Sequence, residues 1–359
     1  MGKYYLAVDI GASSGRHILA HLENNLMVLE EIYRFDNGIK DIGGSLCWEL
    51  DVLYQEILNG LKKCKEVDKI PSSMGIDTWA VDFVLLDKDE KIIGKTVGYR
   101  DSRTKGMDEL VYEIIPEADL YSRNGIQKQL FNSIYQLMAI KDKHPEQMDA
   151  AENFLMVPDY FNFLLTGKKT VEYTNSTTTQ LVSPDTKDWD YELIEKLGYP
   201  KKIFPKISTS GQVLGEFKED IQKLVGFNCN VILPPTHDTA SAVAAVPSTK
   251  DNFLYISSGT WSLMGTERKV ADCSAESRKL NFTNEGGFEY RFRYLKNIMG
   301  LWMIQSVRNE FGKEYSLYCF DNMKTFIENN NAVFIDGKIR LTLDGIMISN
   351  QILIQIMKV

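Results

Sequence analysis

A hydrophobic strand that runs into a Gly/Ser turn occurs twice in this sequence, once near its beginning and again after residue 250. The first unit is Tyr4–Asp9 followed by Gly11–Arg16, and the second is Phe253–Ile256 followed by Ser257–Thr260. Glycines in such turns let backbone N–H groups approach an anion, and Ser or Thr hydroxyls add donors. The pair therefore predicts two halves of one phosphate site, with a nucleoside triphosphate as the ligand. Two ordinary strand-ending turns are the alternative.

Neither turn is a Walker loop. The Gly-Lys-Lys-Thr run within Thr166–Thr170 also lacks the upstream glycine that GxxxxGK[ST] requires. If phosphates bind to this protein, a hairpin-type clamp must hold them.

The composition is that of a globular protein with enough apolar residues for two domains. The chain has 359 residues, 44% of them hydrophobic, with a net charge of −8 and a pI near 5.3. No Lys/Arg-rich cluster stands out, which argues against a nucleic-acid partner. No apolar run approaches the roughly 18 residues of a membrane span, and no leader pattern opens the sequence. We expect a soluble, cytoplasmic monomer.

The cysteines and histidines predict neither disulfides nor a metal cage. The five cysteines are odd in number and show no C-x-x-C spacing, so we expect free thiols. Among the four histidines, His17 and His21 alone have a metal-ligand spacing, and both lie on a predicted strand. A protein-built metal site is therefore not expected.

The first part of the chain has the pattern of an α/β unit. Two more strands, 18–22 and 26–33, predict a meander with the opening strand, so the first turn should close a hairpin. Apolar residues at three- and four-residue spacing predict a helix over 48–65. Strands over 73–77, 81–86 and 92–93 should follow, which gives a mixed sheet with helices.

The middle and the end of the chain differ in their patterns. Residues 104–199 should be mainly helical, with the clearest helices at 133–143 and 158–165. A strand at 230–233 leads through a loop into a helix of small residues, and a further helix is predicted over 298–311. The last segment, 317–359, reads as strands without partners, which is an aggregation hazard.

Two aspartates are candidates for chemistry. Asp9 ends a buried strand beside the first turn, where a carboxylate could hold a hydrated Mg²⁺ that bridges phosphate oxygens. An Asx turn is the alternative. Asp238 lies where a loop enters a helix and could accept a proton from a substrate hydroxyl, with helix capping as the alternative.

Three other segments could contact a polyhydroxylated ligand. The loop Tyr99–Arg103 offers guanidinium and carboxylate groups, although a surface ion-pair loop is equally compatible with it. Trp79 could be a platform for a sugar ring, but a buried core tryptophan is favoured. The hydroxyl-rich run Glu172–Thr179 has a solvated turn as its alternative.

Nine segments, taken in order, resemble the FGGY carbohydrate kinases. The match is dense and collinear from about Tyr5 to Phe311, and several stretches are particular to the branch of the family that phosphorylates L-rhamnulose. The segments are VDIGASSGR, GIDTWAVDFVLLD, YRDSRT, PDYFNFLLTGK, EYTNSTTTQLV, HDTASAV, SSGTWSLMG, TNEGG and KNIMGLW.

The resemblance implies an α/β fold of the actin-like ATPase (ribonuclease H-like) type, with two domains that close over a cleft. It also implies transfer of the ATP γ-phosphoryl group to the 1-hydroxyl of L-rhamnulose in L-rhamnose catabolism, with Mg²⁺ as the cofactor. Another sugar kinase of the family, such as a fuculokinase, is the nearest alternative. A non-catalytic sugar-binding remnant is a second one.

The resemblance also assigns roles to individual residues. Asp238 would be the general base. The nucleotide would be bound by Ala12, Ser13, Ser14, Gly15, Arg16, Thr260 and Gln305. The sugar would be bound by Ala80, His237, Asp238, Thr239 and Asn297. The family has a glycine where this chain has Ala80, a change of one methyl group at a substrate contact.

The resemblance ends near Leu317. We expect a sugar-binding and first phosphate-loop domain over 1–245, the start of a nucleotide-binding domain over 246–316, and an aberrant tail over 317–359. The tail lacks the Gly-Gly-Gly loop that would cradle adenosine and resembles an out-of-frame reading of an AT-rich gene. Sequencing the coding DNA for a frame-restoring base tests this hypothesis.

Overall fold

The computed structural model describes residues 3–248, 250, 253–258, 262–298, 300, 332–335 and 338–342. The chain divides into two compact units. The first comprises Met1–Tyr255 with Gly265–Lys296, and the second comprises Ile256–Met264 with Asn297–Val359. The predicted domain limits at 245 and 316 remain predictions.

A six-stranded mixed sheet forms the centre of the first unit, in the order β11-β12-β6-β1-β2-β3. Antiparallel pairing joins β1 to β2 and β2 to β3, as the predicted meander requires, whereas β1, β6 and β12 run parallel. The strands are β1 (Tyr4–Ile10), β2 (Ser14–Glu23), β3 (Leu26–Asp36), β6 (Pro71–Thr78), β11 (Val213–Glu216) and β12 (Asn230–Ile232).

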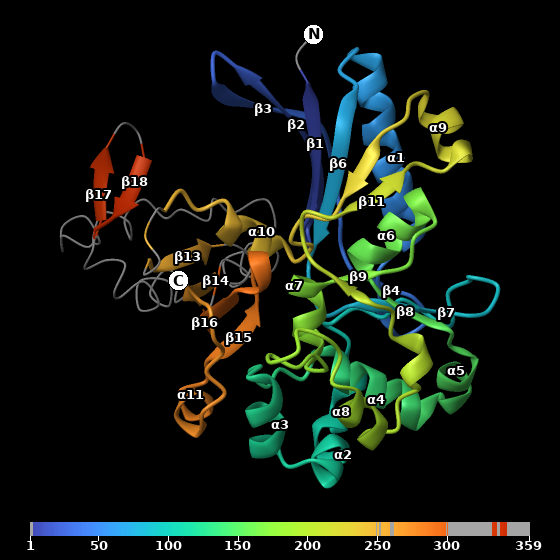
Figure 1. Ribbon diagram of the computed structural model, residues 1–359, viewed down its shortest axis with the longest axis vertical. Coiled ribbons are helices and arrows are strands. Elements are labelled where there is room, and N and C mark those ends of the chain that lie inside the picture. Colours follow the sequence, from blue (N-terminus) through green and yellow to red (C-terminus); the bar gives the residue numbers. More distant parts are fainter. Residues whose placement is uncertain are drawn as a thin grey trace, which may run out of the picture. The chain divides into compact units, whose positions relative to one another are not determined.

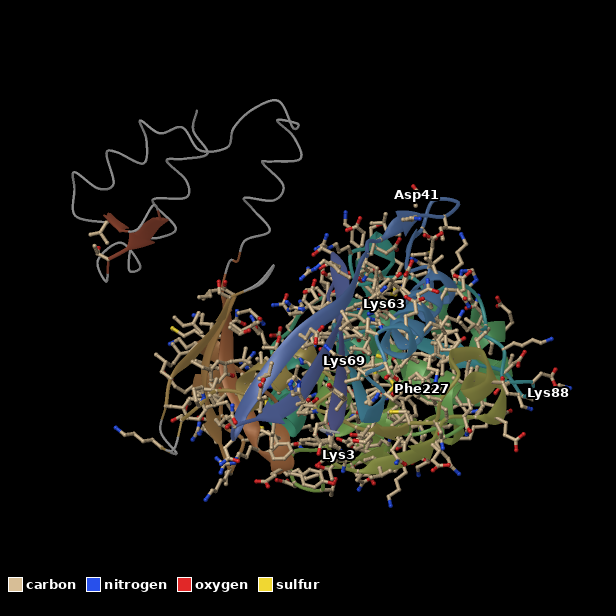
Figure 2. The ribbon with its side chains drawn as sticks, turned by 90° about the horizontal axis from the view of Figure 1, so that it is seen from above. Lys3, Asp41, Lys63, Lys69, Lys88 and Phe227 are labelled. Atoms are coloured by element: carbon tan, nitrogen blue, oxygen red, sulfur yellow. The ribbon has the colours of Figure 1, made fainter. Side chains whose placement is uncertain are left out.

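Helix α1 (Leu50–Glu66) covers the meander, and Figure 1 shows it beside β6. Its buried residues include Leu50, Leu53, Ile57 and Leu61, the spacing that predicted the helix. Gly60 lets α1 approach the sheet, since a Cβ there would lie 2.2 Å from the His17 ring. On the opposite, solvent-facing side of α1, Lys63 pairs with Glu66 at 2.9 Å (Figure 2).

Helices α2, α3, α4, α5 and α8 gather beyond the carboxyl ends of β1 and β6, whereas α9 lies beside α1 (Figure 1). The predicted helices at 133–143 and 158–165 are confirmed as α4 and α6. The helices are α2 (Met107–Ile114), α3 (Glu117–Asn124), α4 (Ser133–Lys143), α5 (Pro145–Ala150), α6 (Val157–Thr166), α7 (Tyr173–Ser176), α8 (Tyr191–Lys196), α9 (Glu219–Val225) and α10 (Asp238–Ala244), with 3-10 turns η1 (Ser102–Thr104), η2 (Thr177–Thr179) and η3 (Lys201–Ile203).

Short strand pairs complete the framework of the first unit. They are β4 (Lys40–Asp41) with β5 (Leu46–Cys47), β7 (Phe83–Leu86) with β8 (Asn153–Met156), and β9 (Val171–Glu172) with β10 (Ile207–Ser208). The predicted strand at 92–93 is wrong, because Ile92 makes one isolated bridge to Leu86.

Residues 265–296 add part of a second sheet, in which β15 and β16 pair antiparallel with Glu285 opposite Arg293. The elements near this sheet are β13 (Tyr255–Ser258), β14 (Ser262–Arg268), α11 (Ala275–Lys279), β15 (Thr283–Gly286), η4 (Phe288–Tyr290) and β16 (Phe292–Ile298). The predicted helix over 298–311 begins at the last residue of β16, and apart from Gly300 its remainder lies outside the described residues.

The tail was expected to hold strands without partners, and its described part corrects this. Strand β17 (Ala332–Ile335) pairs antiparallel with β18 (Lys338–Leu341). The alternating segment 351–357 lies outside the described residues. In the portion of the chain that the structure describes, no helix is long and apolar enough to cross a membrane. Cys47, Cys64, Cys229 and Cys273 are free thiols, as predicted.

Candidate active site

Three aspartates meet where the parallel strands of the main sheet end. Asp9 and Asp77 lie opposite each other in the register of β1 and β6. Asp238 follows the loop after β12, which is tied to the end of β6 by the Thr78 N–H donating to the Thr236 carbonyl at 3.0 Å. Ligands of open α/β sheets bind outside the carboxyl ends of the strands. The topology thus brings together two carboxylates named from the sequence and a third, Asp77, that was not.

Burial and neighbouring carboxylates raise the pKa of two of these groups, Asp77 and Asp238. Burial, and then the charges of Asp9 and Asp238, hold the pKa of Asp77 well above its ordinary value. Burial, opposed by hydrogen bonds from Thr239 and reinforced by the charge of Asp9, raises the pKa of Asp238 to about 6. Such a carboxyl is ionised near neutral pH and yet basic enough to take a proton.

Asp238 remains open to an incoming molecule, with 36% of its side chain exposed. Its Oδ1 accepts from the Thr239 N–H at 2.6 Å and from the Thr239 hydroxyl at 3.2 Å. The capping alternative is only partly met. Asp238 is the first residue of α10, and the N-cap position belongs to His237, whose side chain makes no capping hydrogen bond.

The first Gly/Ser turn closes the β1–β2 hairpin, as predicted. The Gly11 N–H donates to the Ser14 carbonyl at 2.9 Å, and the Asn37 amide donates to the Gly11 carbonyl at 2.7 Å. Ser13 is exposed at the tip, whereas Ala12 and Ser14 are half-buried. The turn is therefore a fixed element beside Asp9.

Arg16 lies at the start of β2 and pairs with Asp9. Its Nη2 lies 2.8 Å and its Nε 2.9 Å from Asp9 Oδ2, and 45% of the Arg16 side chain is exposed. An exposed pair of this kind contributes little stability, typically ~0–1 kcal/mol. The guanidinium is thus free in energetic terms to exchange its carboxylate partner for another anion.

The two glycines of this turn have different reasons to be glycine. A Cβ on Gly15 would lie 2.1 Å from the Phe35 ring, so the packing of β2 against β3 excludes a side chain there. A Cβ on Gly11 would meet nothing closer than the Ser14 carbonyl at 3.6 Å. Neither has a positive φ. Gly15, assigned to the nucleotide from the sequence, is therefore also required by the fold.

A strained turn follows β6 at Ala80–Asp82. The Asp82 N–H donates to the Ala80 carbonyl at 2.9 Å, which closes a γ-turn around Val81 at φ +67°. A positive φ is uncommon for a β-branched residue, and this form of the γ-turn is rare and strained. Ser133 and Gln136 hold it by donating to the Val81 carbonyl. The half-buried Ala80 is thus presented on a rigid, strained segment.

The carboxylate of Asp82 holds two neighbouring tryptophans, whose rings are tilted against each other, beside this turn. Its Oδ2 accepts from the indoles of Trp48 at 2.6 Å and Trp79 at 3.0 Å and from the Tyr99 N–H at 3.1 Å, while Oδ1 accepts from Gln136 at 3.0 Å. The Trp48 and Trp79 rings lie 3.9 Å apart. Trp79 is only 5% exposed, so the favoured prediction of a core tryptophan is confirmed.

The side chains of the loop Tyr99–Arg103 make hydrogen bonds within the protein. Arg103 is half-buried and donates to Gln136 and to the Val97 carbonyl, and Asp101 accepts from the backbone of Leu46 and Arg103. The alternative of a surface ion-pair loop is therefore wrong for these two side chains.

The hydroxyl-rich run Glu172–Thr179 is buried throughout, so its alternative of a solvated turn is wrong. The Glu172 carboxylate accepts from the Thr236 N–H at 3.0 Å and the Thr236 hydroxyl at 3.1 Å, and the Thr174 hydroxyl accepts from the His237 N–H at 3.3 Å. This segment therefore fixes the backbone just before Asp238. In the sequence, the feature that could have indicated this role is Glu172, the single acidic residue in a run of hydroxyl side chains.

His237 has two partners that the sequence did not reveal. Arg293, fully buried on β16, lies with Nη2 2.8 Å from His237 Nδ1 and 2.9 Å from Glu285 Oε2. Burial, and then the charge of Arg293, hold the pKa of His237 well below its ordinary value. No spacing rule connects 237 with 285 and 293.

Four further residues were assigned to the site from the sequence, and the structure describes two of them, Thr239 and Asn297. Thr239 is buried in α10. Asn297 lies on β16, is half-buried and belongs to the second unit. Thr260 and Gln305 lie outside the described residues. Among those described, no group of three or more His, Cys, Asp or Glu side chains is arranged to hold a metal ion by itself.

Sequence comparison identifies close relatives. A rhamnulokinase of Oceanobacillus iheyensis is 52% identical over 89% of this chain, and one of Halalkalibacterium halodurans is 54% identical over 87%. A rhamnulokinase of Bacteroides thetaiotaomicron is 42% identical over 87%. The chain covers 67% of each of the first two and 64% of the third, so it spans about two thirds of the length of these relatives.

Structural comparison supports the predicted fold class. A ligand-bound xylulose kinase from Lactobacillus acidophilus matches 90% of this chain and 66% of its own at a TM-score of 0.76 and 17% identity. Plasmodium falciparum glycerol kinase with ADP matches 93% of this chain and 69% of its own at 0.71 and 15% identity. The α/β, actin-like ATPase fold is thereby confirmed.

The family model completes the comparison. The model of the N-terminal domain of the FGGY family of carbohydrate kinases matches residues 4–244, which contain the whole six-stranded sheet and all three aspartates of the site. This chain belongs to the FGGY family of carbohydrate kinases.

Proposed function

We propose that this protein acts as a rhamnulokinase. It would transfer the γ-phosphoryl group of ATP to the 1-hydroxyl of L-rhamnulose, giving L-rhamnulose 1-phosphate and ADP. The observation that carries the proposal is Asp238, a half-exposed carboxyl that lies beside Asp9 and Asp77 where β1 and β6 end. The 52% and 54% identity to rhamnulokinases supports the choice of sugar.

In this proposal Asp238 is the general base. It takes the proton of the sugar hydroxyl while the oxygen forms its bond to the γ-phosphorus, and the bond to the ADP oxygen breaks. Base catalysis of this kind contributes about 10²–10⁴-fold. The rest of the acceleration would come from positioning and charge stabilisation, on which phosphoryl transfer chiefly depends.

The phosphates would lie against the first turn, Ala12–Arg16, with Thr260 as the second phosphate contact and Gln305 at the nucleotide. Asp9 would hold Mg²⁺ through water. This fits a cation that usually takes one or two carboxylates and completes its shell with water and phosphate oxygens. When bound, Mg²⁺ neutralises charge on the phosphates.

The sugar would be held by Ala80, His237, Thr239 and Asn297. Support for this placement comes from the rigid turn at Ala80 and from the fixed backbone before Asp238. A methyl group at Ala80, where the family has glycine, changes the clearance at this contact and leaves its backbone groups in place.

Titration calorimetry on the chain tests the proposal. We expect L-rhamnulose to bind, Mg·ATP to bind, and ADP release to follow in a coupled assay. L-fuculose and D-xylulose serve as competing ketoses, so a preference for either would replace L-rhamnulose by another substrate of the family. Binding of L-rhamnulose without binding of Mg·ATP would show a sugar-binding protein instead of a kinase.

A further inference from the structure

Arg293 is a large, fully buried side chain that contacts His237, the residue before the candidate base Asp238. Its Nη2 contacts His237 Nδ1 at 2.8 Å and Glu285 Oε2 at 2.9 Å, and its Nε donates to the Gly286 carbonyl at 2.9 Å. Glu285 and Arg293 are opposite partners in the β15–β16 register. The β15–β16 pairing therefore places the guanidinium of Arg293 against the Nδ1 nitrogen of His237.

A guanidinium can only donate hydrogen bonds. The His237 nitrogen that faces it, Nδ1, must therefore accept, which requires a lone pair on Nδ1. A neutral imidazole with a lone pair on Nδ1 carries its proton on Nε2. The adjacent positive charge and the burial of the ring both oppose a second proton.

The opposite arrangement does not fit the contacts. A proton on Nδ1 would point at the guanidinium N–H groups, and the Glu285 Oε2 oxygen lies 3.5 Å from Nδ1. That separation is longer than a good N–H···O bond. The Nε2 side faces Asp238, whose Oδ1 lies 3.5 Å away.

We infer that Arg293, held by Glu285, is a positioning residue that fixes His237 as a neutral Nε2–H donor beside Asp238. This inference rests on the proposed function for its meaning in catalysis. The imidazole then offers its Nε2 proton to a sugar oxygen, and its one lone pair, on Nδ1, is already occupied by the hydrogen bond from Arg293, so the ring cannot act as a base toward the substrate. Asp238 is left as the proton acceptor at this end of the sheet.

The direct test is the tautomer of His237 in the unmodified full chain. Nitrogen NMR of protein labelled with ¹⁵N-histidine distinguishes Nε2–H, Nδ1–H and imidazolium forms, and a His237→Gln variant identifies the signals. We expect Nε2–H at pH 7. His17, whose buried Nε2 lies 3.2 Å from the Ile57 carbonyl, provides an internal reference. An Nδ1–H form or an imidazolium at His237 overturns the inference without any variant at Arg293.

A variant then tests the dependence on Arg293. Arg293→Met alone would leave Glu285 buried without its cation, so we pair it with Glu285→Gln. We expect the His237 tautomer to become mixed and L-rhamnulose to bind about tenfold more weakly, the equivalent of one hydrogen bond. Arg268→Met, at an exposed arginine of β14, is the matched control and should change neither quantity.

The outcomes separate the two ideas. If the double variant keeps a pure Nε2–H form, Arg293 does not set the tautomer and the inference is wrong. If the unmodified chain shows Nε2–H but fails to bind L-rhamnulose, the proposed function fails while the hydrogen-bond assignment stands. If the double variant does not fold, the spectrum of the unmodified chain still decides the tautomer.

Discussion

Asp82 and Asp238 are two aspartates whose carboxylates have different surroundings. Asp82 is 1% exposed and its carboxylate accepts four hydrogen bonds, two of them from indoles. Asp238 keeps 36% of its side chain exposed, accepts hydrogen bonds from Thr239 alone among the residues that the structure describes, and lies near the charge of Asp9. The first carboxylate is satisfied by the fold, whereas the second retains capacity for an incoming proton.

The difference teaches that burial of a carboxylate does not by itself indicate function. For Asp82, burial raises the pKa while the donors from Trp48, Gln136, Tyr99 and Trp79 oppose the rise. For Asp238, burial and a like charge act together. Unused acceptor capacity beside other carboxylates is the feature that marks a candidate base.

The largest effect should come from Asp238→Asn. We expect kcat to fall about 10²–10⁴-fold, because the amide cannot take the hydroxyl proton, while L-rhamnulose still binds. A coupled ADP-release assay and calorimetry measure the two quantities. Turnover close to that of the parent enzyme would show that Asp238 is not the general base. The proposed difference in role between Asp238 and Asp82 would then be wrong.

Asp82→Asn should change stability. The Gln136 amide nitrogen is held toward position 82 because its oxygen accepts from Arg103, so the new amide would place one donor against another. We expect a loss of about 1–3 kcal/mol in the free energy of unfolding, measured with urea.

The control for this change is Asp89→Asn, in the exposed turn next to Lys88, which projects outward in Figure 2. It should stay within about 0.5 kcal/mol of the parent. Equal losses in the free energy of unfolding at positions 82 and 89 would show that the four hydrogen bonds of Asp82 do not contribute to stability.

The raised pKa of Asp238 should make the stability of the protein depend on pH. The pKa of Asp238 is raised from 3.8 to about 6, so the folded state binds its proton more tightly than the unfolded state does. Its stabilising contribution is complete below pH 4 and is lost as the pH rises through 6.

We therefore expect Asp238→Asn to be at least as stable as the parent at pH 7, with the difference between them vanishing near pH 4. Urea unfolding at both pH values measures this. A variant that is less stable at pH 7 would place Asp238 with Asp82, as a residue needed by the fold.

The smallest effect should come from Thr239→Val. The change removes the hydroxyl bond at 3.2 Å and keeps the backbone bond at 2.6 Å. Since that hydroxyl favours the ionised carboxylate, the acid limb of kcat should move to higher pH by less than one unit. A pH–rate profile of the variant and its parent shows the shift, and a move to lower pH would contradict the assignment of that limb to Asp238.

The sequence alone determined the main strands and helices and the family of this protein, because these depend on local patterns. Alternation predicted the β1–β2–β3 meander, and a three- and four-residue spacing predicted α1. Asp9 and Asp238 could be named because each lies in a recognisable strand, turn or loop segment, whereas His237 was assigned through the resemblance to the family.

Only the tertiary structure decided which of these groups meet and in what electrostatic state. Asp77 joins the site through parallel pairing with β1, Glu172 through the loop at Thr236, and Arg293 through a sheet more than fifty residues further along the chain. Contacts between residues so far apart carry no sequence period. The physical reason is that pKa values and tautomers depend on the burial and charges around a group, and these exist only once the sheet and its loops have assembled.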